Sequence, residues 1–150
     1  MTRLARVLPM LTVLAWVITL ALPILDSGNT RGPTIVVSSL GGAPFDFGEA
    51  QAIYLVSWVA VTGCAVSAWL FRSLTWWSVA AILVAVMLGT MLLGLLLDPP
   101  SVIWDGVDRQ GRPIGGYETG EPAAGALVLA VGIAALLAAS ICGLIGRSRH

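Results

Sequence analysis

Four carboxylates that could bind a metal ion or transfer protons lie within one polar run of 20 residues. The run, IWDGVDRQGRPIGGYETGEP, occupies positions 103–122 and holds four of the eight acidic residues of the chain, namely Asp105, Asp108, Glu118 and Glu121. Carboxylates beside glycines suit weak calcium binding, and a close pair of them suits general acid–base catalysis. Their spacing differs from that of an EF-hand loop, and glycines serve tight turns equally well. We expect no catalytic or metal site here, with weak calcium binding as the alternative.

Residue types needed for other kinds of chemistry are missing. The single histidine, His150, is the last residue, so the polar run has no nucleophile–histidine pair and the chain has no set of zinc ligands. Lysine is absent, which excludes a phosphate-binding loop, and no basic patch suits nucleic acid. Cys64 and Cys142 lie inside apolar segments, where we expect them to act as small packing residues. We predict that the protein is not an enzyme and binds no metal, cofactor or nucleic acid.

The composition is that of an integral membrane protein, because 57% of the residues are hydrophobic and 11% are charged. Four segments of about 20 residues are long enough to cross a bilayer as helices. They lie approximately at positions 7–25, 50–71, 76–97 and 123–145, and none contains Asp, Glu, Lys, Arg or His. We therefore predict a single membrane domain at 1–150, all-α in class, that forms a bundle of four transmembrane helices.

The charges around these segments predict their orientation. All eight acidic residues lie in the two long loops, 26–49 and 98–122. Five of the eight arginines flank the other ends of the segments, namely Arg3, Arg6, Arg72, Arg147 and Arg149. By the positive-inside rule both termini are cytoplasmic and the long loops face outward. Abundant Arg, Ala, Gly and Val without Lys is typical of a high-GC bacterium, so we expect a multi-pass protein of a bacterial plasma (inner) membrane.

The first apolar segment could instead be a secretory signal, because it has a basic start and an apolar centre. The residues after its centre, ALPILDS, offer bulky Leu and Ile in place of a small-x-small cleavage site. We interpret the segment as a retained helix. Cleavage, the alternative, would leave three spans with the new start outside.

Small residues recur on one face of the fourth segment, at every fourth position. They are Ala126, Ala130, Ala134, Ala138 and Cys142, and the second segment has a shorter counterpart in Ala52, Ala60, Cys64 and Ala68. Small residues allow another helix backbone to approach closely. We predict that these two faces meet in parallel, since both helices run from outside to inside. The alternative is that the stripes only reflect an alanine-rich composition.

The two outer loops contain strand-forming sequences. The first holds TIVVSSL at 34–40, and the second holds SVIWDGV and RPIGGYE on either side of the turn-forming DRQG. We predict a hairpin in the second loop and a strand from the first paired with its edge, giving an extracytoplasmic β cap of about three strands. Its apolar anchors, and our candidates for partner binding, are Ile103, Trp104, Ile114 and Tyr117.

Four spans with inner termini, a strand-forming first outer loop and a shorter second one resemble the claudin topology. The resemblance is architectural, because the first loop has no Trp and no Cys where claudins carry a tryptophan motif and a disulfide pair. No claudin function is therefore implied. The whole chain is also similar to small uncharacterised four-helix membrane proteins of actinobacteria, without a specific shared motif.

These observations predict a non-catalytic accessory, assembly or scaffolding subunit of a cell-envelope or respiratory membrane complex. Its outer loops would bind a membrane-protein partner, and its helices would contact the lipid bilayer. The alternative is a small-molecule or ion-binding protein that forms a pore as a homo-oligomer. Transport is disfavoured because the four spans contain no Asp, Glu, Lys, Arg or His that could bind or relay an ion.

Overall fold

The computed structural model describes residues 2–28, 33–43, 49–71 and 74–145. Within them it has four helices long and apolar enough to cross a membrane, which confirms the predicted number of spans. Their bounds are α1 Thr2–Ala21, α2 Glu49–Leu70, α3 Leu74–Leu97 and α4 Ala124–Ile145. Helix α1 begins and ends earlier than predicted, and it ends two residues before Pro23, which lacks the backbone N–H that a longer helix would use there.

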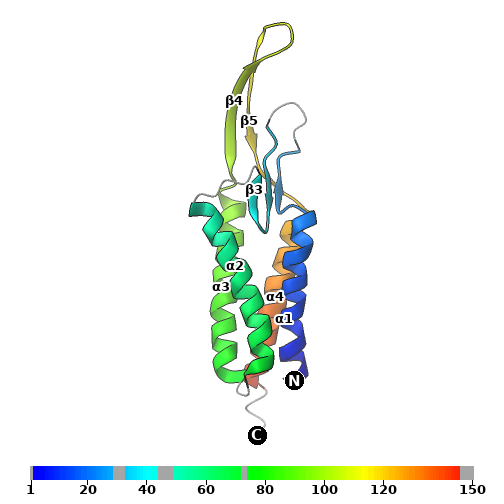
Figure 1. Ribbon diagram of the computed structural model, residues 1–150, viewed down its shortest axis with the longest axis vertical. Coiled ribbons are helices and arrows are strands. Elements are labelled where there is room, and N and C mark those ends of the chain that lie inside the picture. Colours follow the sequence, from blue (N-terminus) through cyan, green and yellow to red (C-terminus); the bar gives the residue numbers. More distant parts are fainter. Residues whose placement is uncertain (1, 29–32, 44–48, 72–73, 146–150) are drawn as a thin grey trace.

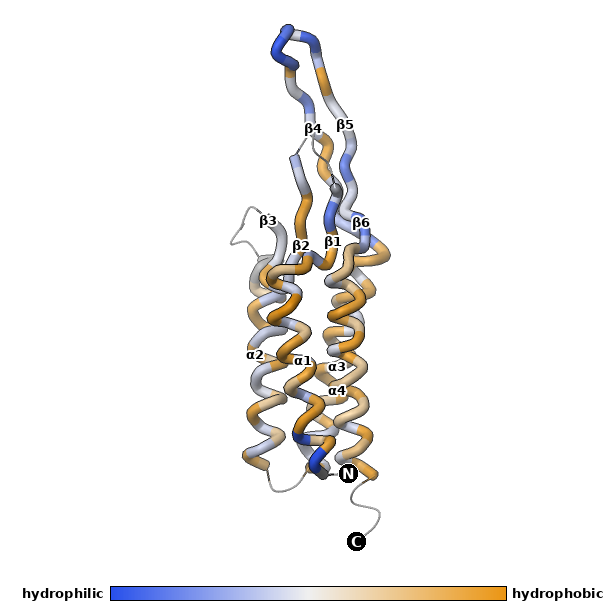
Figure 2. Tube along the Cα trace, turned by 90° about the vertical axis from the view of Figure 1, so that its right-hand side faces the viewer, coloured by the Kyte–Doolittle hydropathy of each residue, from blue (hydrophilic) through white to orange (hydrophobic). Residues whose placement is uncertain are grey.

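The helices form an antiparallel bundle in which each packs against its neighbours in the sequence and α1 also packs against α4 (Figure 1). The α1–α4 contact is the most extensive, the α3–α4 contact comes next, and α2 is held more loosely by α1 and α3. The start of α1 and the end of α4 lie at one end of the bundle, and the strands lie beyond the other end (Figure 2). One end of the molecule is therefore purely helical and the other carries all the described β structure.

Glycines in α4 explain why α1 and α4 approach so closely. A Cβ atom placed on Gly132 would lie 2.6 Å from the Cβ of Ala15, so only glycine fits this crossing. The hydroxyl of Thr12 donates a hydrogen bond of 2.9 Å to the carbonyl of Gly132 across the same contact. A Cβ on Gly125 would overlap the backbone at the end of α1. Close backbone contact and one polar bond thus hold the first and last helices together.

The alanine face of α4 does not lie at these contacts. Ala130, Ala134 and Ala138 are exposed, Cys142 is half-buried, and only Ala126 of the predicted set is buried on α4. The buried face consists of Gly125, Ala126, Leu129, Gly132, Ile133, Leu136, Ala139, Ser140 and Gly143. Helix α4 packs mainly against α1 and α3, so the expected meeting of α2 and α4 inside the chain is wrong. Glycine allows a closer approach than alanine, and the glycines lie on the other face.

Four short strands form one antiparallel sheet at the end of the bundle opposite the start of α1, in the order β3-β2-β1-β6. Their bounds are β1 Leu25–Asp26, β2 Val36–Ser38, β3 Gly41–Ala43 and β6 Glu121–Pro122. The turn after β2 is anchored in the bundle, because the buried hydroxyl of Ser39 donates to the carbonyl of Trp16 at 3.0 Å. The indole of Trp58 in turn donates to the carbonyl of Ser39 at 2.9 Å. The sheet is thus fixed between α1 and α2.

Strands β4 (Ser101–Val107) and β5 (Pro113–Thr119) form a separate two-stranded hairpin. The predicted hairpin is therefore present, and seven residue pairs connect its strands, from Ser101 with Thr119 to Val107 with Pro113. The predicted pairing of the 34–40 segment with this hairpin is wrong. That segment contributes β2, which pairs with β1 and β3, and closing a short local turn costs less entropy than joining the distant hairpin.

Candidate functional site

The hairpin of β4 and β5 projects beyond the small sheet and away from the helices (Figure 2). The two strands contact each other far more than any other described element. At the base, the backbone N–H of Gly120 donates to the carbonyl of Pro100 at 3.0 Å, which closes the hairpin where it leaves the bundle. Both faces of the ribbon are largely open to solvent, so its side chains are accessible at the end of the molecule that carries the strands.

One carboxylate oxygen of Asp108 builds the turn at the tip. It accepts hydrogen bonds of 2.8 Å from the backbone N–H groups of Gln110 and Arg112. Gly111 adopts a φ of 75°, a conformation that glycine enters without strain, and its N–H donates to the carbonyl of Asp108. The tight turn predicted at DRQG is therefore present, and the carboxylate of Asp108 is used to form it.

The carboxylates of Asp105 and Glu118, which acid–base catalysis on the hairpin would need close together, lie apart. Asp105 is paired with Gly115 and Glu118 with Val102, which puts the two carboxylates on opposite faces of the ribbon. Within the described part of the chain, no group of three or more His, Cys, Asp or Glu could hold a metal ion.

The four candidate partner-binding residues also divide between the two faces. Ile103 is paired with Tyr117 on one face, whereas Trp104 and Ile114 lie on the other. A flat partner could contact only one of these pairs at a time. The predicted single recognition surface is thus two separate surfaces.

Trp104 packs on its own hairpin. A Cβ atom on the opposite residue, Gly116, would lie 3.1 Å from Cε2 and Nε1 of the indole, so the ring lies across this glycine. Trp104 is half-buried, and its Nε1 is buried without a hydrogen-bond partner among the described residues. An aromatic ring over a cross-strand glycine stabilises the pairing. The sequence signal for this role was GlyGly at 115–116 opposite an aromatic residue.

The opposite side of the ribbon, which we call the tyrosine face, is exposed and largely apolar. It consists of Ile103, Asp105, Val107, Pro113, Gly115 and Tyr117. The exposed fractions are 83% for Ile103, 69% for Val107 and 62% for Tyr117. Val107 and Pro113 were missed as candidates, although strand alternation from Ile103 would have found Val107.

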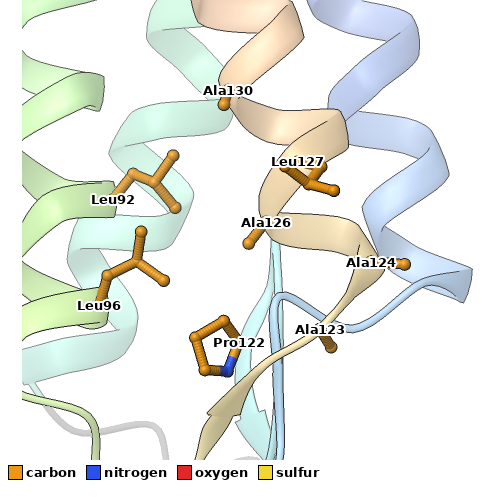
Figure 3. A pocket seen from close by; sticks show the side chains of 8 residues that line it. All are labelled: Leu92, Leu96, Pro122, Ala123, Ala124, Ala126, Leu127 and Ala130. Carbon is orange, nitrogen blue, oxygen red and sulfur yellow. The ribbon is translucent and has the colours of Figure 1, made fainter.

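An apolar groove of about 560 Å³ lies between α3 and α4 at the end of the bundle that carries the strands (Figure 3). Leu92 and Leu96 form one wall, Ala126 and Ala130 form the other, and Pro122 closes the end nearest the strands. All the side chains that line it are hydrocarbon, so no side chain of the groove could orient a polar ligand. It suits an acyl chain or an apolar side chain.

Two indoles inside the bundle form hydrogen bonds between helices. Trp16 donates through Nε1 to the hydroxyl of Ser57 at 3.3 Å, and that hydroxyl donates to the carbonyl of Tyr54. Trp77 donates through Nε1 to the carbonyl of Cys64, which is buried in α2, at 2.9 Å. These bonds cross-link α1, α2 and α3, and they leave the same groups unavailable to bind an ion.

The fold and the hairpin define a class: a small four-helix protein able to span a membrane, with a short antiparallel sheet and a projecting β-hairpin at one end. Comparison of the chain with protein-family models, with curated proteins and with solved structures finds no significant match. The function must therefore be argued from the hairpin and the bundle themselves.

Proposed function

We propose that the protein is a non-catalytic accessory, assembly or scaffolding subunit of a bacterial cell-envelope or respiratory membrane complex. In this proposal the four helices cross the plasma membrane, both termini are cytoplasmic, and the hairpin is the recognition element outside. The distribution of arginine and acidic residues supports this orientation. The carboxylates of the hairpin, which are either on opposite faces or used in the turn, support a role without catalysis.

The observation that carries the proposal is the tyrosine face. Ile103, Val107 and Tyr117 stand beyond the bundle with more than half of each side chain exposed. An apolar surface of this kind on a soluble part of a protein marks an interaction site, and tyrosine is enriched at the centres of such sites. A partner that covers this face would remove apolar area from water.

A second function is a small-molecule or ion-binding protein that works as a homo-oligomeric pore. The exposed alanine face of α4, Ala130, Ala134 and Ala138, favours it, because small residues allow helices of two copies to pack closely. Three hydroxyls of the helices give little support to a polar path through the bundle. Thr12, Ser57 and Ser140 each donate a hydrogen bond to a backbone carbonyl, so these hydrogens are not free to bind a passing solute.

Gentle detergent extraction from native membranes, followed by identification of the purified components, separates the two functions. A scaffolding subunit is expected to purify with a different membrane protein in a fixed molar ratio. Purification of the chain alone, or with copies of itself only, would contradict the scaffolding function and favour the homo-oligomer.

A further inference from the structure

The tyrosine face has an acidic centre within an apolar surround. Asp105 lies between the Ile103–Tyr117 pair on one side and Val107 with its partner Pro113 on the other. The carboxylate of Asp105 makes no hydrogen bond or ion pair with any residue in the part of the chain that the structure describes. A carboxylate held in the middle of an apolar face is costly to cover unless the covering surface supplies a positive charge.

Glycine leaves room beside this carboxylate. Gly115, the residue opposite Asp105, is exposed and has no side chain, so no cross-strand side chain covers the carboxylate from that position. The space over Gly115 is bordered by Asp105, on the opposite strand, and by Tyr117, two positions along the same strand. Tyr117 is the diagonal cross-strand neighbour of Asp105 on this face. A guanidinium or ammonium group in this space would meet a carboxylate and the edge or face of an aromatic ring.

The charge of the loop favours the same kind of partner. The second outer loop, 98–122, has five acidic residues and two arginines, so its net charge is negative. A second copy stacked on the same face by a two-fold axis would bring two Asp105 carboxylates together in an apolar contact, which is unfavourable for like charges. The bilayer is also a poor occupant, because the hairpin projects away from the helices (Figure 2).

We propose that the tyrosine face binds an extracytoplasmic segment of another protein, which inserts a lysine or arginine over Gly115 against Asp105 and covers Ile103, Val107 and Tyr117 with apolar side chains. The inference rests on the proposed scaffolding function and names the chemistry of the partner. It also assigns separate roles to the two faces of the hairpin. Trp104 maintains the ribbon, and the tyrosine face makes the contact.

Site-specific photo-crosslinking in intact cells of the native host tests this. A photo-reactive residue is placed at Ile103, on the tyrosine face, and in a matched variant at Val102, the adjacent residue on the opposite face. We expect an adduct with a different protein from position 103 and about tenfold less from position 102. The crosslinked segment of the partner is expected to contain a lysine or arginine.

Charge variants supply the second measurement. Asp105→Arg is expected to lower the adduct yield from position 103 by about tenfold or more, the loss typical of reversing one close charge pair. Glu118→Gln, on the opposite face, is the control and is expected to leave the yield unchanged. Replacing the basic residue of the partner by Glu should lower the yield, and combining that change with Asp105→Arg should restore it. Amide hydrogen exchange of β4 and β5 checks that each variant keeps its hairpin.

Each other result overturns the inference. Equal adducts from both faces, an adduct made of two copies of this chain, a contact segment without a basic residue, no adduct from position 103, or a yield insensitive to Asp105→Arg would each contradict it. If a stoichiometric partner co-purifies while position 103 gives no adduct, the scaffolding function stands and this surface is wrong. If no partner co-purifies, the function itself fails.

Discussion

At the scale of single residues, Asp108 shows how a possible catalytic carboxylate serves structure. Its Oδ1 accepts from the N–H groups of Gln110 and Arg112, so Asp108→Ala removes two hydrogen bonds from the turn. We expect the free energy of opening the hairpin to fall by about 1–2 kcal/mol, measured by amide hydrogen exchange of β4 and β5. Asp108→Asn keeps a carbonyl oxygen at this place and is expected to lose less. Equal losses of opening free energy in the two variants would mean that the negative charge of Asp108 is needed to stabilise the turn.

Trp104 is a second residue whose role changes once its neighbours are known. Because the indole lies over Gly116, Trp104→Ala is expected to weaken the hairpin by about 0.5–1 kcal/mol, as cross-strand pairs do. Faster amide exchange in residues 101–119, with the helices unchanged, is the expected measurement. Ile103→Ala, on the other face, is the matched comparison and should speed exchange less, because Ile103 is 83% exposed whereas Trp104 is half-buried. Similar effects of the two substitutions on amide exchange would contradict a special role of Trp104 in stabilising the hairpin.

Sequence reasoning located the hairpin and its turn but combined residues from both faces into one site. Turn-forming residues act locally, so DRQG predicts its conformation without knowledge of the rest of the chain. The burial of Trp104 depends on register, because only a Trp104–Gly116 pairing places the ring over a glycine. A shift of one residue would exchange the two faces, and the sequence alone did not specify the register.

At the scale of elements, the contact between α1 and α4 depends on glycine. Gly132→Leu would force a side chain into Ala15 and Thr12, and we expect it to lower the stability of the bundle by about 1–3 kcal/mol. Ala134→Leu is the matched control on the exposed face and is expected to be tolerated. Thermal unfolding of the purified protein in one detergent compares them. Equal destabilisation would indicate that the alanine face packs against another chain.

The positions of the four long helices could be predicted closely from the sequence, but the face of α4 that is buried in the bundle could not. Length and hydropathy determine whether a helix crosses a bilayer, and both are properties of one segment. The choice between a glycine face and an alanine face depends on which helices become neighbours. Strands β1 and β6 have two residues each, and Pro122 cannot donate a ladder hydrogen bond, so neither gives a strand signal in the sequence.

At the scale of the whole molecule, the separation of helical and β ends gives a direct test of orientation. In a variant lacking Cys64 and Cys142, a cysteine at Gln110, on the exposed turn, should react with a membrane-impermeant thiol reagent in intact cells. A cysteine at Ser73, in the link that the arginine distribution places in the cytoplasm, should react only after the membrane is permeabilised. The reverse pattern would put the hairpin and its acidic residues in the cytoplasm.

The β1–β6 pairing joins the segment that follows the first helix to the segment that precedes the last helix, and this order bears on biosynthesis. Leu25 and Asp26 pair with Pro122 and Glu121, and the N–H of Ala123 donates to the carbonyl of Ile24 at 2.9 Å. Leu25 and Pro122 are 97 positions apart and Asp26 and Glu121 are 95 apart, so the sheet is complete only after residues 121–123, just before α4, have been made. A chain that ends before Glu121 is expected to leave β1 open to added protease, whereas the full chain resists.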